Sequence, residues 1–455
     1  MEKIINTYSL KKNISYLLTS NIVSFGIVFI SSLLIFRNIN RDDYGLYIII
    51  TSLFAIVELF MGGYNQSILR FLKEKISEVD KQQIILYTVY YKYAILLLFV
   101  LALGVMLSFD FMQFLINDYS QVSDSVNKYL TIAIISSFLS VLSGVSSTIL
   151  GALYHYKITN NSMIIKNSIY LLCVVFLIFH TDEYLTFLYT SLALNVILFS
   201  YLSSVLWIKY PKYSLLKLLK HRLDFSIYKR YLFSYATPLT TISLLTYSKN
   251  HLPLLILGKT FDLEDVSIFS IMKKFFKVAH TISGSFLQPL LSKFIEIKNI
   301  DIQHYKRVMN KLFFAIFFMR SFLYISLLFL SNYFFLLYKI EISSLNSMIF
   351  AILGFEFIIA GIMTHYGTLL STNLSTKYLL FTSVMRFILE LLLIYFVLFL
   401  YGILGAAFIL LVSRFFESLS AYYFVQKEKI LKYDFVILLA ITPFIIYFYM
   451  HVFGA

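Results

Sequence analysis

Three lysines inside a long apolar stretch, residues 267–298, are the side chains best placed to do chemistry. At about 100° per residue, Lys273 and Lys277 fall on one face of a helix, with Lys274 beside them. A lysine near the centre of a bilayer costs roughly 2.5 to 3.5 kcal/mol, so these three are expected to face water or an anion. An alternative starts the membrane span near Val278 and leaves the lysines in an external loop. We favour lysines that lie within the membrane span, because the alternative adds three cations to the external side, which has few basic residues.

The composition indicates an integral membrane protein. Of the 455 residues 59% are hydrophobic and only 14% charged, with a mean hydropathy of +0.80. The net charge of +14 comes from short basic segments between apolar runs, a pattern typical of membrane topology, so nucleic acid is excluded as a partner. The single cysteine, Cys173, permits no intramolecular disulfide.

No soluble catalytic domain and no cofactor is predicted. The sequence contains neither a G-x-x-x-x-G-K-S/T phosphate loop, nor H-E-x-x-H, nor G-x-S-x-G. The connections between apolar runs are also short, which argues against a membrane polysaccharide polymerase or ligase with a large external loop. The chain is therefore predicted not to be an enzyme.

The apolar runs predict thirteen membrane spans, each about 20 residues long. The first is a retained span and not a signal peptide, because its apolar run is too long. The expected ranges are 14–36, 46–67, 86–109, 127–150, 162–180, 185–208, 232–257, 267–295, 308–331, 345–370, 378–400, 403–425 and 434–453.

The basic residues predict a cytoplasmic N-terminus. With that orientation, 26 of the 38 lysines and arginines lie in cytoplasmic connections, 5 lie in external ones and 7 lie within spans. The cytoplasmic count includes Lys92 and Lys166. Such an asymmetry is the positive-inside pattern of a multi-pass membrane protein.

A basic connection divides the chain into similar halves. Residues 33–47 and 255–269 align at an offset of 222, each with an apolar helix, a basic residue, two adjacent acids and a second apolar helix. The offset equals one six-span half, which predicts parallel repeats around an axis along the membrane normal. The fold class expected is an all-α polytopic membrane protein of about 12 to 14 helices, in two six-helix bundles. The predicted parts are a bundle at 1–208, a cytoplasmic connection at 209–230, a bundle at 231–425 and an extra helix at 426–455.

Other ionisable residues within the spans suggest further roles. Glu58, near the middle of the second span, is a candidate for binding a coupling proton or sodium ion, or for a structural ion pair. Lys249, in a span interrupted by proline, is a candidate cation near a hinge, or a side chain that extends to the surface. Arg320 has no acid three or four residues away and needs a tertiary partner or a ligand. The pairs Arg386 with Glu390 and Arg414 with Glu417 have intrahelical spacing and are interpreted as structural.

Short motifs in order along the chain resemble those of a known family. They are Phe36-Arg37, residues 41–47 (RDDYGLY), Gly62-Gly63, residues 68–71 (ILRF), residues 235–238 (YATP) and residues 255–258 (LILG). In this order and spacing they resemble the bacterial O-antigen and capsule polysaccharide flippases of the multidrug/oligosaccharidyl-lipid/polysaccharide (MOP) exporter superfamily. Arg70 matches the basic position that follows the second span in that family.

The resemblance implies alternating access and export of a polyprenyl-pyrophosphate-linked oligosaccharide, from the cytoplasmic to the outer leaflet of the bacterial inner membrane. Membrane lipids and polysaccharide assembly proteins are the other partners it implies. We expect Lys273, Lys274 and Lys277 to hold the pyrophosphate, assisted by Arg70, Lys249 or Arg320. The alternative is a drug or cation antiporter of the same superfamily, which would carry more acids within its spans.

Overall fold

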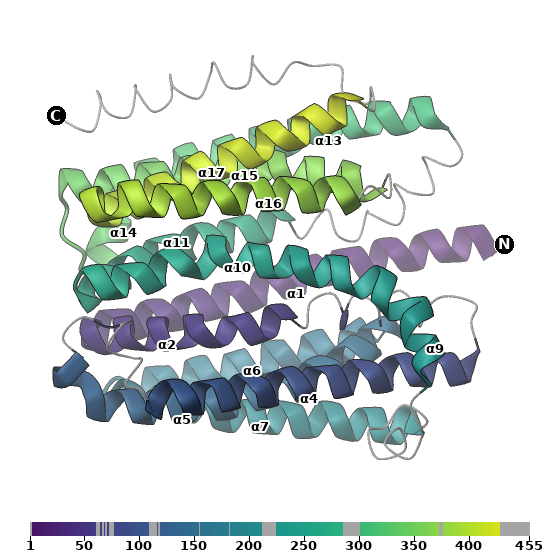
Figure 1. Cartoon of the computed structure of the whole chain (residues 1–455), viewed down its shortest axis with the longest axis horizontal. Helices are drawn as coiled ribbons and strands as arrows, with labels where there is room; N and C mark the ends of the chain where they lie inside the picture. The colour runs from purple at the N-terminus through teal and green to yellow at the C-terminus, as the bar shows by residue number, and fades with distance from the viewer. Residues whose placement is uncertain are drawn as a thin grey trace. The chain divides into compact units, whose positions relative to one another are not determined.

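The computed structural model describes most of the chain (Figure 1). The predicted last span, 434–453, lies outside the described residues, as does most of the basic connection at 209–230. Described are residues 2–60, 64–65, 68, 71, 77–108, 116, 119–153, 155–181, 183–211, 224–284, 301–372 and 376–427.

The regular structure of the described residues is helical throughout. The chain divides into two compact units, Met1–Ser267 and Ile268–Ala455. Helices of the first unit are α1 (Glu2–Asn38), α2 (Arg41–Phe60), α4 (Glu78–Ser108), α5 (Tyr119–Ala152), α6 (Tyr156–Leu177), α7 (Tyr184–Lys209), α9 (Phe225–Ile227), the π-helix η3 (Tyr228–Phe233) and α10 (Ser234–Thr260). The second unit holds most of α11 (Leu263–Gly284), then α13 (Ile302–Phe329), α14 (Ser331–Leu337), α15 (Ser344–Thr372), α16 (Thr376–Leu393), the π-helix η5 (Ile394–Leu398) and α17 (Phe399–Lys427).

The described residues of each predicted span up to residue 425 are helical, which confirms an all-α polytopic fold. Among the described residues, 8 helices are long and apolar enough to cross a membrane. The helix α11 is not one of them, because Lys273, Lys274 and Lys277 interrupt its apolar sequence. The end of the first six-helix bundle at 208 and the start of the second at 231 remain predictions.

Two basic residues that were counted with the cytoplasmic connections fall within the predicted spans 86–109 and 162–180. Lys92 and Lys166, both assigned to cytoplasmic connections, lie inside α4 and α6. The periodic apolar residues on both sides of each lysine extend the helix past it. Without these two residues, 24 lysines and arginines remain in the predicted cytoplasmic connections against 5 in the external ones, so the positive-inside asymmetry remains.

In the first unit the two repeated helix starts lie against each other. Both α2 and α11 begin with acidic residues, and Arg41 of α2 forms an ion pair with Glu264 of α11. A side chain at Gly45 would collide with the carbonyl oxygen of Leu263, so the backbones approach closely there. Farther along, α10 packs on α2, and Tyr247 donates to the carbonyl of Ser52 at 2.8 Å.

In the second unit α15 is central and packs against α13, α16 and α17. The start of α13 is fixed by Asp301, whose carboxylate accepts hydrogen bonds from the N–H groups of Gln303 and His304 at 2.8 and 3.0 Å. These bonds, that from His304 most of all, lower the pKa of the Asp301 carboxyl. The chain turns between the predicted spans 378–400 and 403–425 at Gly402, whose φ of 54° favours glycine.

Candidate functional site

The three predicted lysines lie in the middle of α11, which begins at Leu263, and so they are in a helix and not in a loop. Lys273 and Lys274 are half-buried, and Lys277 is exposed. The opposite side of the helix is anchored in the core, since Met272 is fully buried. The helix therefore has one packed face and one cationic face, as a 3.6-residue period requires.

Arg320 of α13 has the tertiary partners that the sequence did not reveal. Its guanidinium donates to the carbonyl oxygen of Phe357 at 2.8 Å and lies 3.1 Å from Nδ1 of His280. An arginine can only donate, so His280 accepts through Nδ1 and is neutral there. The guanidinium also lies over the Phe357 ring, and it occupies the space that a side chain at Gly361 would take.

The Nε of Arg320 is buried and has no hydrogen-bond partner among the described residues. A guanidinium has five N–H donors, and a buried donor without a partner costs about 1 to 3 kcal/mol. Arg320 therefore keeps hydrogen-bonding capacity that the described residues do not use.

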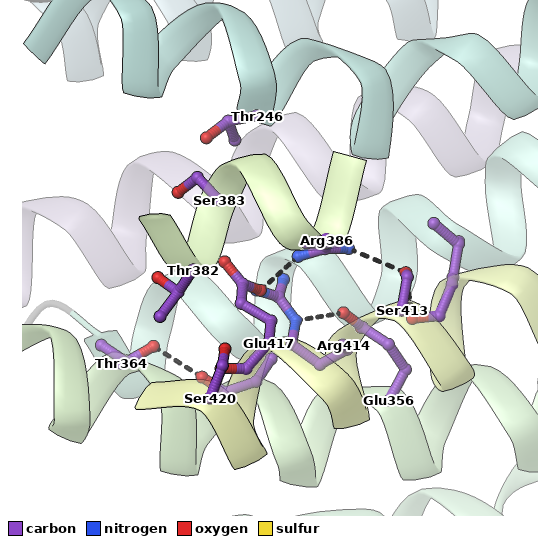
Figure 2. Close-up of polar contacts among 12 residues, drawn as sticks. Thr246, Glu356, Thr364, Thr382, Ser383, Arg386, Ser413, Arg414, Glu417 and Ser420 are labelled. Atoms are coloured by element: carbon purple, nitrogen blue, oxygen red, sulfur yellow. Dashed lines mark hydrogen bonds and ion pairs between the residues drawn. The ribbon is translucent and has the colours of Figure 1, made fainter. Parts of the chain in front are cut away.

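A network of two arginines and three glutamates joins α15, α16 and α17 (Figure 2). Arg386 pairs with Glu390 at 2.8 Å and with Glu417 at 2.5 Å. Arg414 pairs with Glu417 at 2.6 Å and with Glu356 at 2.9 Å. The two intrahelical pairs predicted from spacing are thus confirmed, but Glu417 serves both arginines, which spacing could not show.

This arginine–glutamate network also interacts with the basic residues of α11 and α13. The carboxylate of Glu356 attracts the charges of Lys273 and Arg320. In the second unit, the predicted site residues and the arginine–glutamate network together comprise six basic residues and three acids. The basic residues are Lys273, Lys274, Lys277, Arg320, Arg386 and Arg414, and the acids are Glu356, Glu390 and Glu417. The region can therefore neutralise its own glutamates and still carry positive charge.

The remaining predicted site residues stay predictions. Arg70 lies outside the described residues. Glu58 lies in α2 and Lys249 in α10, and the side chains of both are outside the described part of the chain. The helix α10 continues through Pro238 and Pro253.

The sequence analysis missed one buried cation completely. Lys92 of α4 is only 1% exposed, and its Nζ donates to the side-chain oxygen of Asn65. The signal available was a lysine within a 31-residue helical, mostly apolar segment.

The described helices define an all-α fold with several candidate membrane spans. No family model and no curated protein matches the chain. Solved structures do match. The inward closed conformation of the lipid II flippase MurJ has a TM-score of 0.71 and 14% identity, over 90% of this chain and 87% of that one.

MATE transporters also match. An inward-facing multidrug resistance MATE family transporter of the MOP superfamily has a TM-score of 0.68 and 11% identity, over 90% of this chain and 94% of that one. The Vibrio cholerae MATE transporter VcmN in the bent form has a TM-score of 0.62 and 14% identity, over 92% of this chain and 97% of that one. The fold is therefore similar to those of the MurJ flippase and the MATE transporters.

Proposed function

We propose that the chain is a flippase that moves a polyprenyl-pyrophosphate-linked oligosaccharide from the cytoplasmic to the outer leaflet of the bacterial inner membrane. It would act by alternating access and serve O-antigen or capsule assembly. The motifs of the first two spans and the fold shared with MurJ support this proposal. The observation that carries it is the cationic face of α11, with Arg320 of α13 in the same unit.

The chemistry of the headgroup matches these side chains. A pyrophosphate has several acceptor oxygens and negative charge, which lysine and arginine bind through charge-assisted hydrogen bonds. In the proposed mechanism Lys273, Lys274 and Lys277 hold the pyrophosphate, and Arg320 contributes its unused Nε donor. Arg70 and Lys249 are proposed to assist, and the polyprenyl chain stays in lipid.

The membrane potential can drive the movement. An inside-negative potential favours outward transfer of an anion by about 2.3 kcal/mol per charge per 100 mV. No ATP site is needed for this step. Glu58 is the proposed site of a coupling proton or sodium ion.

A drug or cation antiporter is the competing function, because the MATE transporters have the same fold. The described acids of the second unit argue against it. Glu356, Glu390 and Glu417 each pair with an arginine, which reduces their capacity to bind a cationic drug.

The test is replacement of Lys273, Lys274 and Lys277 by alanine, singly and jointly, with surface polysaccharide measured in cells that depend on this protein. We expect partial loss from single changes and complete loss from the triple change, at normal membrane levels. The exposed Lys311 of α13 provides the matched control, and Lys311→Ala should keep normal polymer. Normal surface polymer from the triple variant would remove the proposed anion site.

A further inference from the structure

The first unit contains a cavity that the proposed pyrophosphate site does not use. It has a volume of about 480 Å³ and is bounded by α2, α5, α6 and α7. This is within the range of about 300 to 1,000 Å³ that is typical of small-molecule sites. A cavity of this size at membrane depth holds either water or a ligand.

One wall of the cavity is made of hydroxyl groups. Ser136, Ser140, Ser143 and Ser147 of α5 all line it, and their spacing of four, three and four residues puts them on one helical face. A hydroxyl can both donate and accept a hydrogen bond. The wall is therefore suited to the hydroxyl groups of a sugar, which have the same dual character.

Among the described residues that line the cavity, one is basic. Lys166 of α6 lines it, and its Nζ donates to the side-chain oxygen of Asn195 at 3.0 Å. An amide carries no charge, and the lining residues that are described include no carboxylate. The ammonium group has three donors, so two remain for an occupant. The charge of Lys166 is therefore free to attract one anionic group.

The rest of the wall has features expected around a sugar ring. Tyr47 and Phe54 of α2 contribute aromatic surface, on which the apolar face of a sugar can pack. Gly144 of α5 also lines the cavity, and a Cβ atom added there would meet nothing within 4 Å. The space in front of Gly144 is therefore open to an occupant.

We propose that this cavity binds an acidic saccharide unit, a sugar ring that carries one carboxylate. Lys166 binds the carboxylate, the serines of α5 bind the ring hydroxyls, and the aromatic side chains cover an apolar face. The inference rests on the proposed function, since the saccharide belongs to the transported oligosaccharide. It adds to that function a substrate class, namely glycans that contain uronic-acid-type sugars.

Binding to the purified full-length protein in lipid nanodiscs tests this proposal. The probes are methyl β-D-glucuronide, the neutral methyl β-D-glucoside and acetate, each titrated by saturation-transfer NMR. We expect the glucuronide to bind about tenfold more tightly than the glucoside, because a charge-assisted hydrogen bond is added. Acetate, which lacks the ring, should bind more weakly than either sugar.

Two variants and two matched controls locate the site. Lys166→Gln should keep the bond to Asn195 and reduce glucuronide affinity to that of the glucoside. Gly144→Leu should fill the open space and abolish binding of both sugars, while the protein keeps its melting temperature. The exposed Lys157 of the same helix gives the control Lys157→Gln, and Gly26 of α1, which also has nothing within 4 Å of an added Cβ atom, gives Gly26→Leu. Both controls should bind as the unchanged protein does.

Several results would overturn the proposal. If none of the probes binds, the cavity holds only water; if acetate binds as tightly as the glucuronide, the site is a simple anion site. Equal glucuronide affinity in Lys166→Gln and the unchanged protein places the sugar elsewhere. Binding without any role in surface polymer overturns the proposed function and leaves the cavity a saccharide site. If the protein is needed for surface polymer but binds none of the sugars, the proposed function stands and the cavity is not a saccharide site.

Discussion

Two lysines in the helices of the first unit and the arginine–glutamate network of the second unit have different kinds of partner. In the first unit Lys92 and Lys166 donate to the amide oxygens of Asn65 and Asn195. In the second unit the arginine–glutamate network neutralises its cations with carboxylates. A lysine held by an amide has an uncharged partner, whereas the charge of an arginine held by carboxylates is offset by the charges of its partners.

The difference shows that a buried basic residue does not by itself indicate an anion site. The carboxylates of the network make Arg386 and Arg414 part of the packing between helices. Lys166, with a neutral partner, adds a net charge to the cavity it lines. The identity of the hydrogen-bond partner decides which basic residues can bind a ligand.

Among the changes that test this difference between the units, Arg386→Met is expected to have the largest effect on stability. The change leaves Glu390, which is 1% exposed, without its cation, and should cost about 3 to 5 kcal/mol of stability. The measurement is thermal or denaturant unfolding of the purified protein. Adding Glu390→Gln should recover much of the loss, because the buried charge is removed too. A double variant no more stable than Arg386→Met would show that the pair does not act as a unit.

A smaller effect is expected from Gly45→Ala in the first unit, which depends on close backbone packing. The new methyl group would collide with the carbonyl oxygen of Leu263 and cost about 1 to 3 kcal/mol. Gly26→Ala is the matched control, because its methyl group has free space and alanine favours a helix by about 0.5 to 1 kcal/mol. Similar melting temperatures for the two variants would contradict the close approach.

The ion pair between Arg41 and Glu264 should matter less. The side chains are 29% and 49% exposed, so water and salt screen them, and Arg41→Ala should cost at most about 1 kcal/mol. Unfolding measured at low and high salt provides the check, with the difference disappearing at high salt. A cost that persists in 1 M salt would contradict a screened surface pair.

The smallest change in stability is expected from Lys166→Gln, within about 0.5 kcal/mol. Glutamine can still donate to Asn195, and no carboxylate loses a partner. The same unfolding measurement compares it with Arg386→Met. If both variants were destabilised equally, Lys166 would be part of a charged network, and the contrast between the two units would be wrong.

The sequence predicted the helices well because apolar runs of about 20 residues have few alternatives in a bilayer. The intrahelical pairs were equally predictable, since residues three or four apart lie on one face. Glu356 was not predictable as a partner of Arg414, because the two residues are brought together only by the packing of α15 on α17. The carbonyl of Phe357 as an acceptor for Arg320 depends on the same kind of contact.

The cavity was missed for a different reason. Serines at positions 136, 140, 143 and 147 form a visible face in the sequence, but serine is also common at tight contacts between membrane helices. Lys166 had been placed in a connection, so its charge was not considered together with that face. Only the structure brings α5, α6 and α7 around one space.

The contact between Gly45 and the carbonyl of Leu263 also bears on biogenesis. Translation at about 5 to 20 residues per second separates the synthesis of these two positions by roughly 10 to 45 seconds. During this interval α2 is inserted in the bilayer without the neighbour that its glycine accommodates. The ribosome therefore delivers the first unit in an unfinished form, and that unit is completed only when the start of α11 leaves the exit tunnel.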